Sequence, residues 1–249
     1  MNKLRHAFYQ PYKFLVYIPA MVASTAASWA VVTAVTPFAG ADETSVRVGG
    51  AWGRFNARIT PMTVEVLGRE NIRPGQSYVI CSNHQSHFDI FLLYGWLGLD
   101  FKWVMKQELR KIPFLGHACE QLGHIFIDRS NHEKAVASIN AAKEKIVNGK
   151  AVLFFPEGTR SMDGKLGPFK KGAFRMALDL GLPILPVTIQ GTRDVLPPGT
   201  MDLQPGHAKM IIHPEVPTTD YSSRTMKKFV DKVREIIQQG LDTGKPAKE

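Results

Sequence analysis

The sequence has little cysteine and lacks the signatures of several protein classes. Only two cysteines, Cys81 and Cys119, occur among 249 residues, which excludes a disulfide-rich scaffold and fits a reducing compartment. No zinc-finger spacing, long basic run or other nucleic-acid motif is present. A Gly-x-Ser-x-Gly elbow is also missing, so nothing supports a serine hydrolase. There are no internal repeats, and only the tail after residue 241 has low complexity.

Charge and length narrow the class of partner. The formal net charge is +9, which suits a nucleic acid, a phosphorylated substrate or an anionic membrane. Because no nucleic-acid motif occurs, the sequence favours the other two. A chain of this length suffices for one domain with a sizeable core and a membrane anchor.

Residues 14–41 contain no charged side chain, and this stretch exceeds the roughly 20 residues that cross a bilayer as a helix. A signal peptide is one alternative, because basic residues precede the stretch and Ala39-Gly40-Ala41 resembles a cleavage site. However, the apolar core of a signal peptide has only about 7–15 residues. A buried helix of a soluble protein rarely stays uncharged for so long. We therefore expect a retained membrane segment that ends near Pro37.

A second helical pattern follows this segment. Val48, Trp52, Phe55 and Ile59 recur at helical spacing, and arginines line a neighbouring stripe. An apolar face with tryptophan beside basic residues suits a membrane interface, and packing on the rest of the domain is the alternative. We assign residues 1–61 to an N-terminal membrane anchor and residues 62–249 to a second domain.

Short apolar strands alternate with helices in this second domain. Strands are expected over residues 63–67, 78–82, 102–105, 124–127, 151–155, 184–190 and 209–213. Helices are expected over residues 87–95, 114–121, 131–148, 171–180 and 223–239. Such alternation predicts an α/β fold with a mostly parallel or mixed central sheet flanked by helices, beside the N-terminal membrane-associated segment.

A histidine and a carboxylate follow the second expected strand, in the segment Asn-His-Gln-Ser-His-Phe-Asp. Imidazole accepts a proton near neutral pH, and a carboxylate can hold one ring nitrogen so that the other faces a substrate. His84 and Asp89 are five positions apart, about 500° of rotation on a straight helix, so they would not share a face. They can meet only if His84 lies at or before the first helical turn.

A second polar cluster, residues 155–160 with the sequence Phe-Pro-Glu-Gly-Thr-Arg, follows the strand that begins at Ala151. Two strands that end in polar, loop-forming clusters suggest one shared site at the edge of a sheet. This pairing favours a catalytic role for His84 over a structural one. A metal site built on His84, His87 and Asp89 is disfavoured, because the sequence has no further ligand cluster.

Four ordered blocks extend this pattern: His84-x4-Asp89, residues 123–129, residues 155–160 and residues 182–187. Residues 106–116 and 169–172 also match. Across residues 62–216 the sequence resembles the glycerolipid acyltransferases, specifically the 1-acylglycerol-3-phosphate acyltransferases. The resemblance covers neither residues 1–61 nor the tail.

The resemblance implies transfer of a fatty acyl group from a thioester to the sn-2 hydroxyl of lysophosphatidic acid, giving phosphatidic acid in phospholipid biosynthesis. Acyl-coenzyme A or acyl carrier protein would be the co-substrate, with no other cofactor and no metal. His84 is then the expected base and Asp89 fixes its tautomer, without an acyl-enzyme. Another lysophospholipid or an aminolipid is the alternative acceptor.

The same blocks suggest residues that bind the substrate. They are Lys106, Arg129, Glu157, Gly158, Thr159, Arg160 and Lys170. Arg129 and Arg160 each close a strand-end motif, and arginine suits phosphate oxygens. The two lysines are equally well explained as solvated surface charges. Glu157 can organise its loop, bind hydroxyl groups of the acceptor or pair with an arginine.

Three further residues near these motifs have alternative readings. Asn83 shapes the turn or helps to hold an oxyanion, and His87 is better explained as a polar residue at a helix start than as a catalytic one. Cys81 lies within an expected strand, where a thiol is usually inert. Residues 88–103 line an acyl channel or belong to the core.

Topology follows from the charge before the apolar stretch, which favours an N-terminus inside the cell. A single span would then place the catalytic domain away from cytosolic acyl donors. A helical hairpin that dips into one leaflet, as in some members of the family that the chain resembles, removes this conflict. We expect a monotopic anchor at the cytoplasmic face of a bacterial inner membrane, with an anionic membrane surface as partner.

Overall fold

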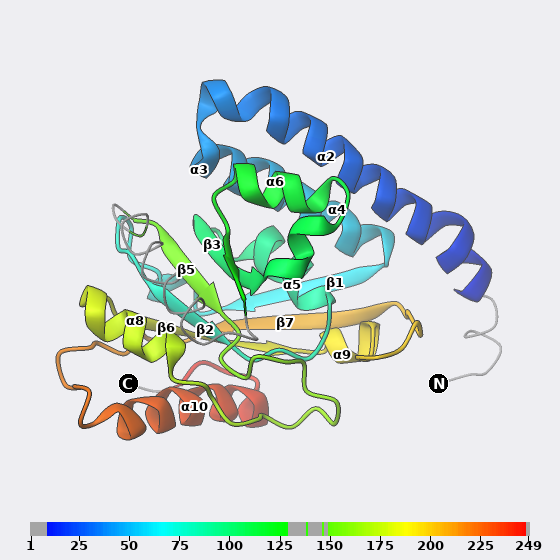
Figure 1. Cartoon of the computed structure of the whole chain (residues 1–249). Helices are drawn as coiled ribbons and strands as arrows, with labels where there is room; N and C mark the ends of the chain where they lie inside the picture. Colours follow the sequence, from blue (N-terminus) through cyan, green and yellow to red (C-terminus); the bar gives the residue numbers. More distant parts are fainter. Residues whose placement is uncertain (1–8, 129–137, 139–145, 147–148, 248–249) are drawn as a thin grey trace.

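The computed structural model describes residues 9–128, 138, 146 and 149–247. Its centre is a seven-stranded sheet in the order β1-β7-β6-β2-β5-β3-β4 (Figure 1). The strands are β1 Met62–Leu67, β2 Val79–Ser82, β3 Phe101–Lys106, β4 Ile125–Ile127, β5 Ala151–Phe154, β6 Ile184–Gln190 and β7 Gly206–Ile212. Neighbours pair in parallel except β6 and β7, which are antiparallel. The predicted α/β fold with a mixed sheet is confirmed.

Helices cover both faces of the sheet. They are α2 Ile18–Ala39, α3 Ala41–Thr44, α4 Gly50–Ile59, α5 Phe88–Trp96, α6 Leu115–Gln121, α8 Gly172–Leu180, α9 Thr192–Val195 and α10 Met226–Thr243. The described chain also has two short π-helical segments, η1 Lys13–Tyr17 and η2 Ser45–Gly49, and two 3₁₀-helical segments, η3 Arg69–Asn71 and η4 Gln107–Lys111. The helix expected over residues 131–148 falls almost entirely outside the described residues.

The two faces of the sheet bury separate cores, because side chains alternate along each strand. In the β2 segment, Tyr78 and Ile80 belong to the core shared with α4 and α5. Val79 and Cys81 belong to the opposite core, between the sheet and helices α8 and α10 (Figure 1). Every residue of β2 and β5 is buried, as expected for central strands with continuous apolar runs.

The N-terminal segment forms a long helix followed by a return. Residues 9–39 make the one described helix that is long and apolar enough to cross a membrane. The helix continues through Pro37 to Ala39, two residues beyond the end we expected there, and stops at Gly40 with φ +81°. Glycine adopts this conformation without steric cost, so it breaks the helix and allows the return through α3.

Helix α4 packs closely on α5. A Cβ atom on Gly53 would lie 2.7 Å from the carbonyl oxygen of Phe91, so glycine is what permits this approach. Trp52 meets Phe91 edge to face and donates a hydrogen bond to Thr25 of α2. The sequence left two interpretations of residues 48–59, a membrane-interface helix and a helix packed on the domain. The face with Trp52 packs on the domain, whereas Phe55 remains 45% exposed.

Helices α2 and α4 form a helical hairpin with α3 at its tip, and ion pairs join this tip to the sheet. Asp42 of α3 accepts hydrogen bonds from Lys102 at 2.8 Å and from Lys150 at 2.7 Å. The ammonium groups lower the pKa of Asp42 against the opposing effect of its desolvation, which is the largest single influence. Because Lys102 is almost fully buried, these contacts fix the hairpin against β3.

Candidate active site

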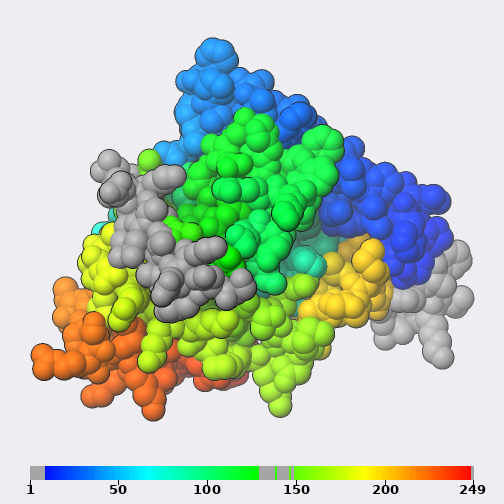
Figure 2. All heavy atoms as spheres, in the orientation of Figure 1, coloured from blue at the N-terminus to red at the C-terminus, as the bar shows by residue number. Residues whose placement is uncertain are grey.

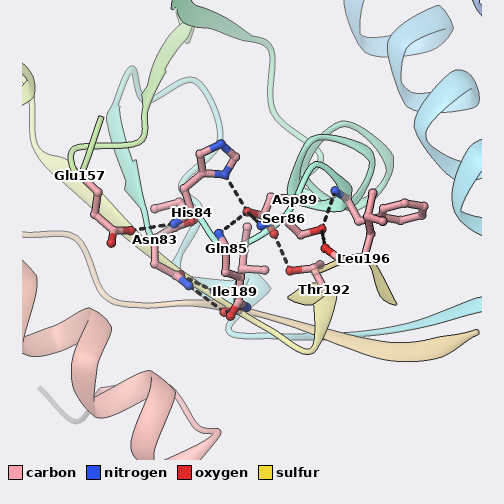
Figure 3. A network of polar contacts seen from close by, with 11 residues as sticks. Asn83, His84, Gln85, Ser86, Asp89, Glu157, Ile189, Thr192 and Leu196 are labelled. Atoms are coloured by element: carbon pink, nitrogen blue, oxygen red, sulfur yellow. Dashed lines mark hydrogen bonds and ion pairs between the residues drawn. The ribbon is translucent and has the colours of Figure 1, made fainter. Parts of the chain in front are cut away.

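His84 and Asp89 are in direct contact just beyond the end of β2. His84 lies in the loop after Ser82, and Asp89 lies in the first turn of α5. The imidazole Nδ1 is 2.7 Å from Asp89 Oδ2 (Figure 3). The chain bends between the two residues, which is the geometry that their spacing requires.

The carboxylate of Asp89 is fully buried and held by several donors. Oδ2 also accepts the backbone N–H groups of Gln85 at 2.8 Å and Ser86 at 3.0 Å. Oδ1 accepts the hydroxyl of Thr192, the first residue of α9 (Figure 3). These contacts fix the orientation of the carboxylate and aim one oxygen at His84.

The His84 ring is held from a second side by Phe155. The two rings stack with their centroids 3.8 Å apart and their planes 9° from parallel. The neutral tautomer that carries its proton on Nδ1 is the one that can donate to the Asp89 carboxylate, and this tautomer places the lone pair on Nε2. Nε2 has no partner among the described residues, and the side chain is 16% exposed. The site therefore presents an oriented base to the solvent side.

Glu157 holds the main chain of the His84 loop. Its Oε1 accepts the backbone N–H of His84 at 2.9 Å, and its Oε2 accepts that of Gly167 at 2.9 Å. Burial raises the pKa of Glu157, and these two N–H groups oppose that rise. The backbone of Ser161 also donates to the carbonyl of His84 at 2.8 Å. The contacts of Glu157 correspond to the first of its three interpretations, organisation of the loop.

Asn83 extends the pairing of β2 beyond the end of the strand. Its amide donates to the carbonyl of Ile189 at 2.9 Å and accepts the Ile189 N–H at 2.7 Å (Figure 3). Both ends of the amide are thus engaged with β6. The geometry matches the turn-shaping interpretation of Asn83 and leaves its amide committed away from a substrate.

The described members of the predicted cations, Lys106, Arg160 and Lys170, come from segments at or after the carboxyl ends of β3 and β5. Gly158 has φ +76°, and a Cβ atom there would lie 2.8 Å from Lys170 Nζ, so this glycine admits the lysine side chain. Thr159 is exposed beside them, and Arg160 is half-buried. Lys106 is exposed at the carboxyl end of β3. Arg129, the remaining predicted cation, lies outside the described residues.

Arg160 lies close enough to the His84 loop to act on it electrostatically. His87 is partly exposed, but the desolvation of its ring by neighbouring protein lowers its pKa to about 4, and the positive charge of Arg160 is the second largest cause. His87 is therefore neutral at pH 7. It occupies the position before the first residue of α5, the helix-start role that we favoured for it.

Two other groups in the motifs have structural surroundings. Cys81 is fully buried in the core of α8 and α10, and burial raises the pKa of its thiol, so it is protonated and inaccessible. His124, in the second block, contacts Tyr94 Oη at 2.5 Å and the Trp103 N–H at 3.3 Å. Burial lowers the pKa of His124 to about 3, so it stays neutral.

Thr192 and Phe155 are the site residues whose contacts our sequence reading missed. The sequence motifs include Phe155 only as the first residue of its block, and they do not include Thr192. One signal was available for Thr192: it closely follows an expected strand, as the polar clusters after β2 and β5 do. Because β6 is parallel to β2, their carboxyl ends lie at the same edge of the sheet.

Comparison with known proteins gives this geometry a context. The acyltransferase family model matches residues 63–190. A 1-acyl-sn-glycerol-3-phosphate acyltransferase of Chlamydomonas reinhardtii is 33% identical over 72% of this chain and 53% of its own length. A protein of the same name from Limnanthes alba is 31% identical over 79% of this chain and 71% of its own. The chain thus spans about half the length of some curated relatives.

A solved structure extends the similarity to the whole chain. The crystal structure of PlsC from Thermotoga maritima, a 1-acyl-sn-glycerophosphate (LPA) acyltransferase, matches with a TM-score of 0.80 and 29% sequence identity. The match covers 97% of each chain, so it includes most of the N-terminal helical segment as well as the sheet.

Proposed function

Because this chain belongs to the acyltransferase family, we propose that it transfers a fatty acyl group from a thioester to the sn-2 hydroxyl of lysophosphatidic acid. The observation that supports this most directly is the His84–Asp89 pair, whose loop accepts a hydrogen bond from Ser161, the residue next to Arg160, and contains His87, on which the charge of Arg160 acts. A base in a loop that also lies near an arginine suits an acceptor that has both a hydroxyl and a phosphate. The names and similarity of the relatives favour the same acceptor.

The reaction needs one base and no covalent intermediate. His84 Nε2 takes the proton of the acceptor hydroxyl as its oxygen attacks the thioester carbonyl carbon. Asp89 stabilises the imidazolium that forms. When the tetrahedral adduct collapses, the carbon–sulfur bond breaks, and the leaving thiolate receives the proton from His84. The products are phosphatidic acid and a free thiol.

Substrate binding is assigned to the edge of the sheet that holds the base. Arg160 takes the phosphate through its planar guanidinium, with Lys106, Lys170 and Arg129 as further cations. Gly158 and Thr159 shape the loop that bears Arg160. The thioester of coenzyme A or acyl carrier protein is the co-substrate, and the reaction chemistry requires no other cofactor.

The site of action is the membrane, reached through the hairpin of α2 to α4. The apolar surface of the long N-terminal helix supports membrane association. A hairpin seated in the cytoplasmic leaflet of a bacterial inner membrane keeps the base on the same side as cytosolic thioesters. Phosphatidic acid then forms where lysophosphatidic acid already resides.

The test is acyl transfer by purified protein in vesicles that contain lysophosphatidic acid, with labelled acyl-coenzyme A or acyl carrier protein as donor. His84→Ala should lower kcat roughly 10²- to 10⁴-fold while the fold is retained, the range typical of a lost general base. Arg160→Ala should raise KM for the lipid, and the exposed Arg224→Ala on the segment before α10 is the matched control. Equal product from wild type and His84→Ala would refute the mechanism. If the protein acylates an aminolipid and Arg160→Ala leaves that activity unchanged, the acceptor is the aminolipid and not lysophosphatidic acid.

A further inference from the structure

The loop between η4 and α6 exposes two large apolar side chains. Ile112 and Phe114 are each 42% exposed, on either side of Pro113. The loop follows β3, whose last residue is Lys106 at the active-site edge. Exposed apolar residues are common singly, but two of them in one short loop require an explanation from their surroundings.

The backbone of this loop is strained at Phe114. Phe114 has φ +63° and ψ −53°, and the Leu115 N–H donates to the Pro113 carbonyl at 2.7 Å, which makes a γ-turn of the rare positive-φ form. The Gly116 N–H donates to Ile112 at 2.9 Å, which braces the turn. A bulky residue held in this conformation indicates that the surrounding structure imposes it.

The apolar loop continues the exposed surface of α2. The ring of Trp29, on α2, lies 5.3 Å from that of Phe114, and its Nε1 donates to His117 of α6 at 2.8 Å. Val22, two helical turns before Trp29 and on the same face, is 53% exposed. Figure 2 shows the surface of α6, in green, directly against the blue surface of α2. Ile112 and Phe114 therefore lie beside a helix that is itself apolar enough for a bilayer.

Positive charge near the loop indicates that an anionic lipid surface, and not a protein partner, contacts Ile112 and Phe114. Lys111 is exposed immediately before Ile112 and has no ion pair among the described residues. A lysine beside exposed apolar groups can extend its ammonium to anionic headgroups while its neighbours enter the acyl region. A net charge of +9 adds attraction toward an anionic leaflet.

From these contacts we propose that residues 111–114 form a second membrane-inserting element, distinct from the hairpin. Ile112 and Phe114 enter the acyl boundary of the leaflet beside Trp29, and Lys111 stays at the headgroups. The element sets the height of the active-site edge above the bilayer, because only η4 separates it from Lys106. Its membrane contact does not depend on the proposed reaction.

The binding test uses the full chain and vesicles of phosphatidylcholine and phosphatidylglycerol, with no substrate. An environment-sensitive fluorophore is attached at Ile112→Cys, since the native Cys81 and Cys119 are buried. Met162→Cys is the matched control, because Met162 is 66% exposed on the loop after Arg160. Vesicles should shift the emission of the Ile112 label to the blue, and quenchers placed in the acyl chains should quench it but not the Met162 label.

A second variant tests insertion without an attached label. Replacing both Ile112 and Phe114 with Ser should weaken vesicle partitioning by about tenfold, as expected when two apolar side chains no longer enter the leaflet. The Met162→Ser control should bind as wild type does. Equal quenching of the two labels would overturn the proposal. An emission shift that depends on protein concentration without vesicles would also overturn it, because a second copy would then cover the loop.

Discussion

Replacing Thr192 with Val should lower turnover without weakening substrate binding. The hydroxyl of Thr192 donates to Oδ1 of Asp89, whose other oxygen receives His84 Nδ1. Thr192 and Asp89 are both fully buried, so no water can replace the lost donor without rearrangement. Valine has nearly the shape of threonine, and the change therefore removes a hydrogen bond while it leaves the packing of α9 almost intact.

The size of the effect follows from the charge of the acceptor. A hydrogen bond to a charged group contributes about 1.5–3 kcal/mol. If all of that were lost in the transition state, kcat would fall by roughly 10- to 150-fold, at about 1.4 kcal/mol per factor of ten. Asp89 keeps three other donors, so we expect the lower end of this range, about tenfold. KM should stay unchanged, because Thr192 acts through Asp89 and not on the substrate.

The assay measures kcat and KM for acyl transfer on vesicles, together with the melting temperature of each variant. Thr192→Ser keeps the hydroxyl and should restore kcat, which separates the hydrogen bond from the packing of the methyl group. A Thr192→Val protein with wild-type kcat and only a lower melting temperature would refute the reasoning. In that case Thr192 would stabilise the fold without orienting the dyad.

Three further predictions concern stability and the buried groups. Burial lowers the pKa values of His213 and His124 from 6.5 to about 4 and about 3, so the unfolded chain binds protons at a higher pH than the folded chain, and stability should fall as pH drops below about 6.5. If the melting temperature of His213→Gln falls as steeply between pH 6.5 and 4 as that of the wild type, this prediction is wrong. Gly53→Ala should cost roughly 1–3 kcal/mol in urea unfolding, whereas Gly172→Ala, whose Cβ would meet nothing within 4 Å, should be neutral or stabilising. Cys81→Ala should keep wild-type kcat while losing stability, and an inactive but folded variant would revive an acyl-cysteine route.

The sequence predicted best what is local. All seven expected strands occur with small shifts at their ends; for example β7 begins at Gly206, three residues before the expected start. The bend between His84 and Asp89 could be deduced because both residues lie in one short segment, where helix geometry alone limits the options. The last helix, expected over residues 223–239, runs from Met226 to Thr243 and ends before Gly244 with φ +64°. Periodicity locates such a helix, but its ends depend on local capping.

Long-range contacts were beyond the reach of periodicity. Three readings of Glu157 stayed open because its partners are the backbones of His84, 73 positions away, and of Gly167. Thr192 was overlooked because its contact with Asp89 spans 103 positions and depends on β6 lying next to β2. Strand order is a property of the whole sheet, and a single sequence pattern does not specify it.

These two classes of contact have different roles in the site. The pair to which we assign the chemistry is encoded within six residues, whereas its orientation depends on segments that follow β5 and β6. Asn83 shows the connection most clearly, because its amide pairs with the backbone of Ile189 and joins the base-bearing loop to the strand that precedes Thr192. A motif alone can therefore propose the base. Only the assembled sheet fixes the direction in which that base points, because it brings Thr192 to Asp89 and the Phe155 ring to His84.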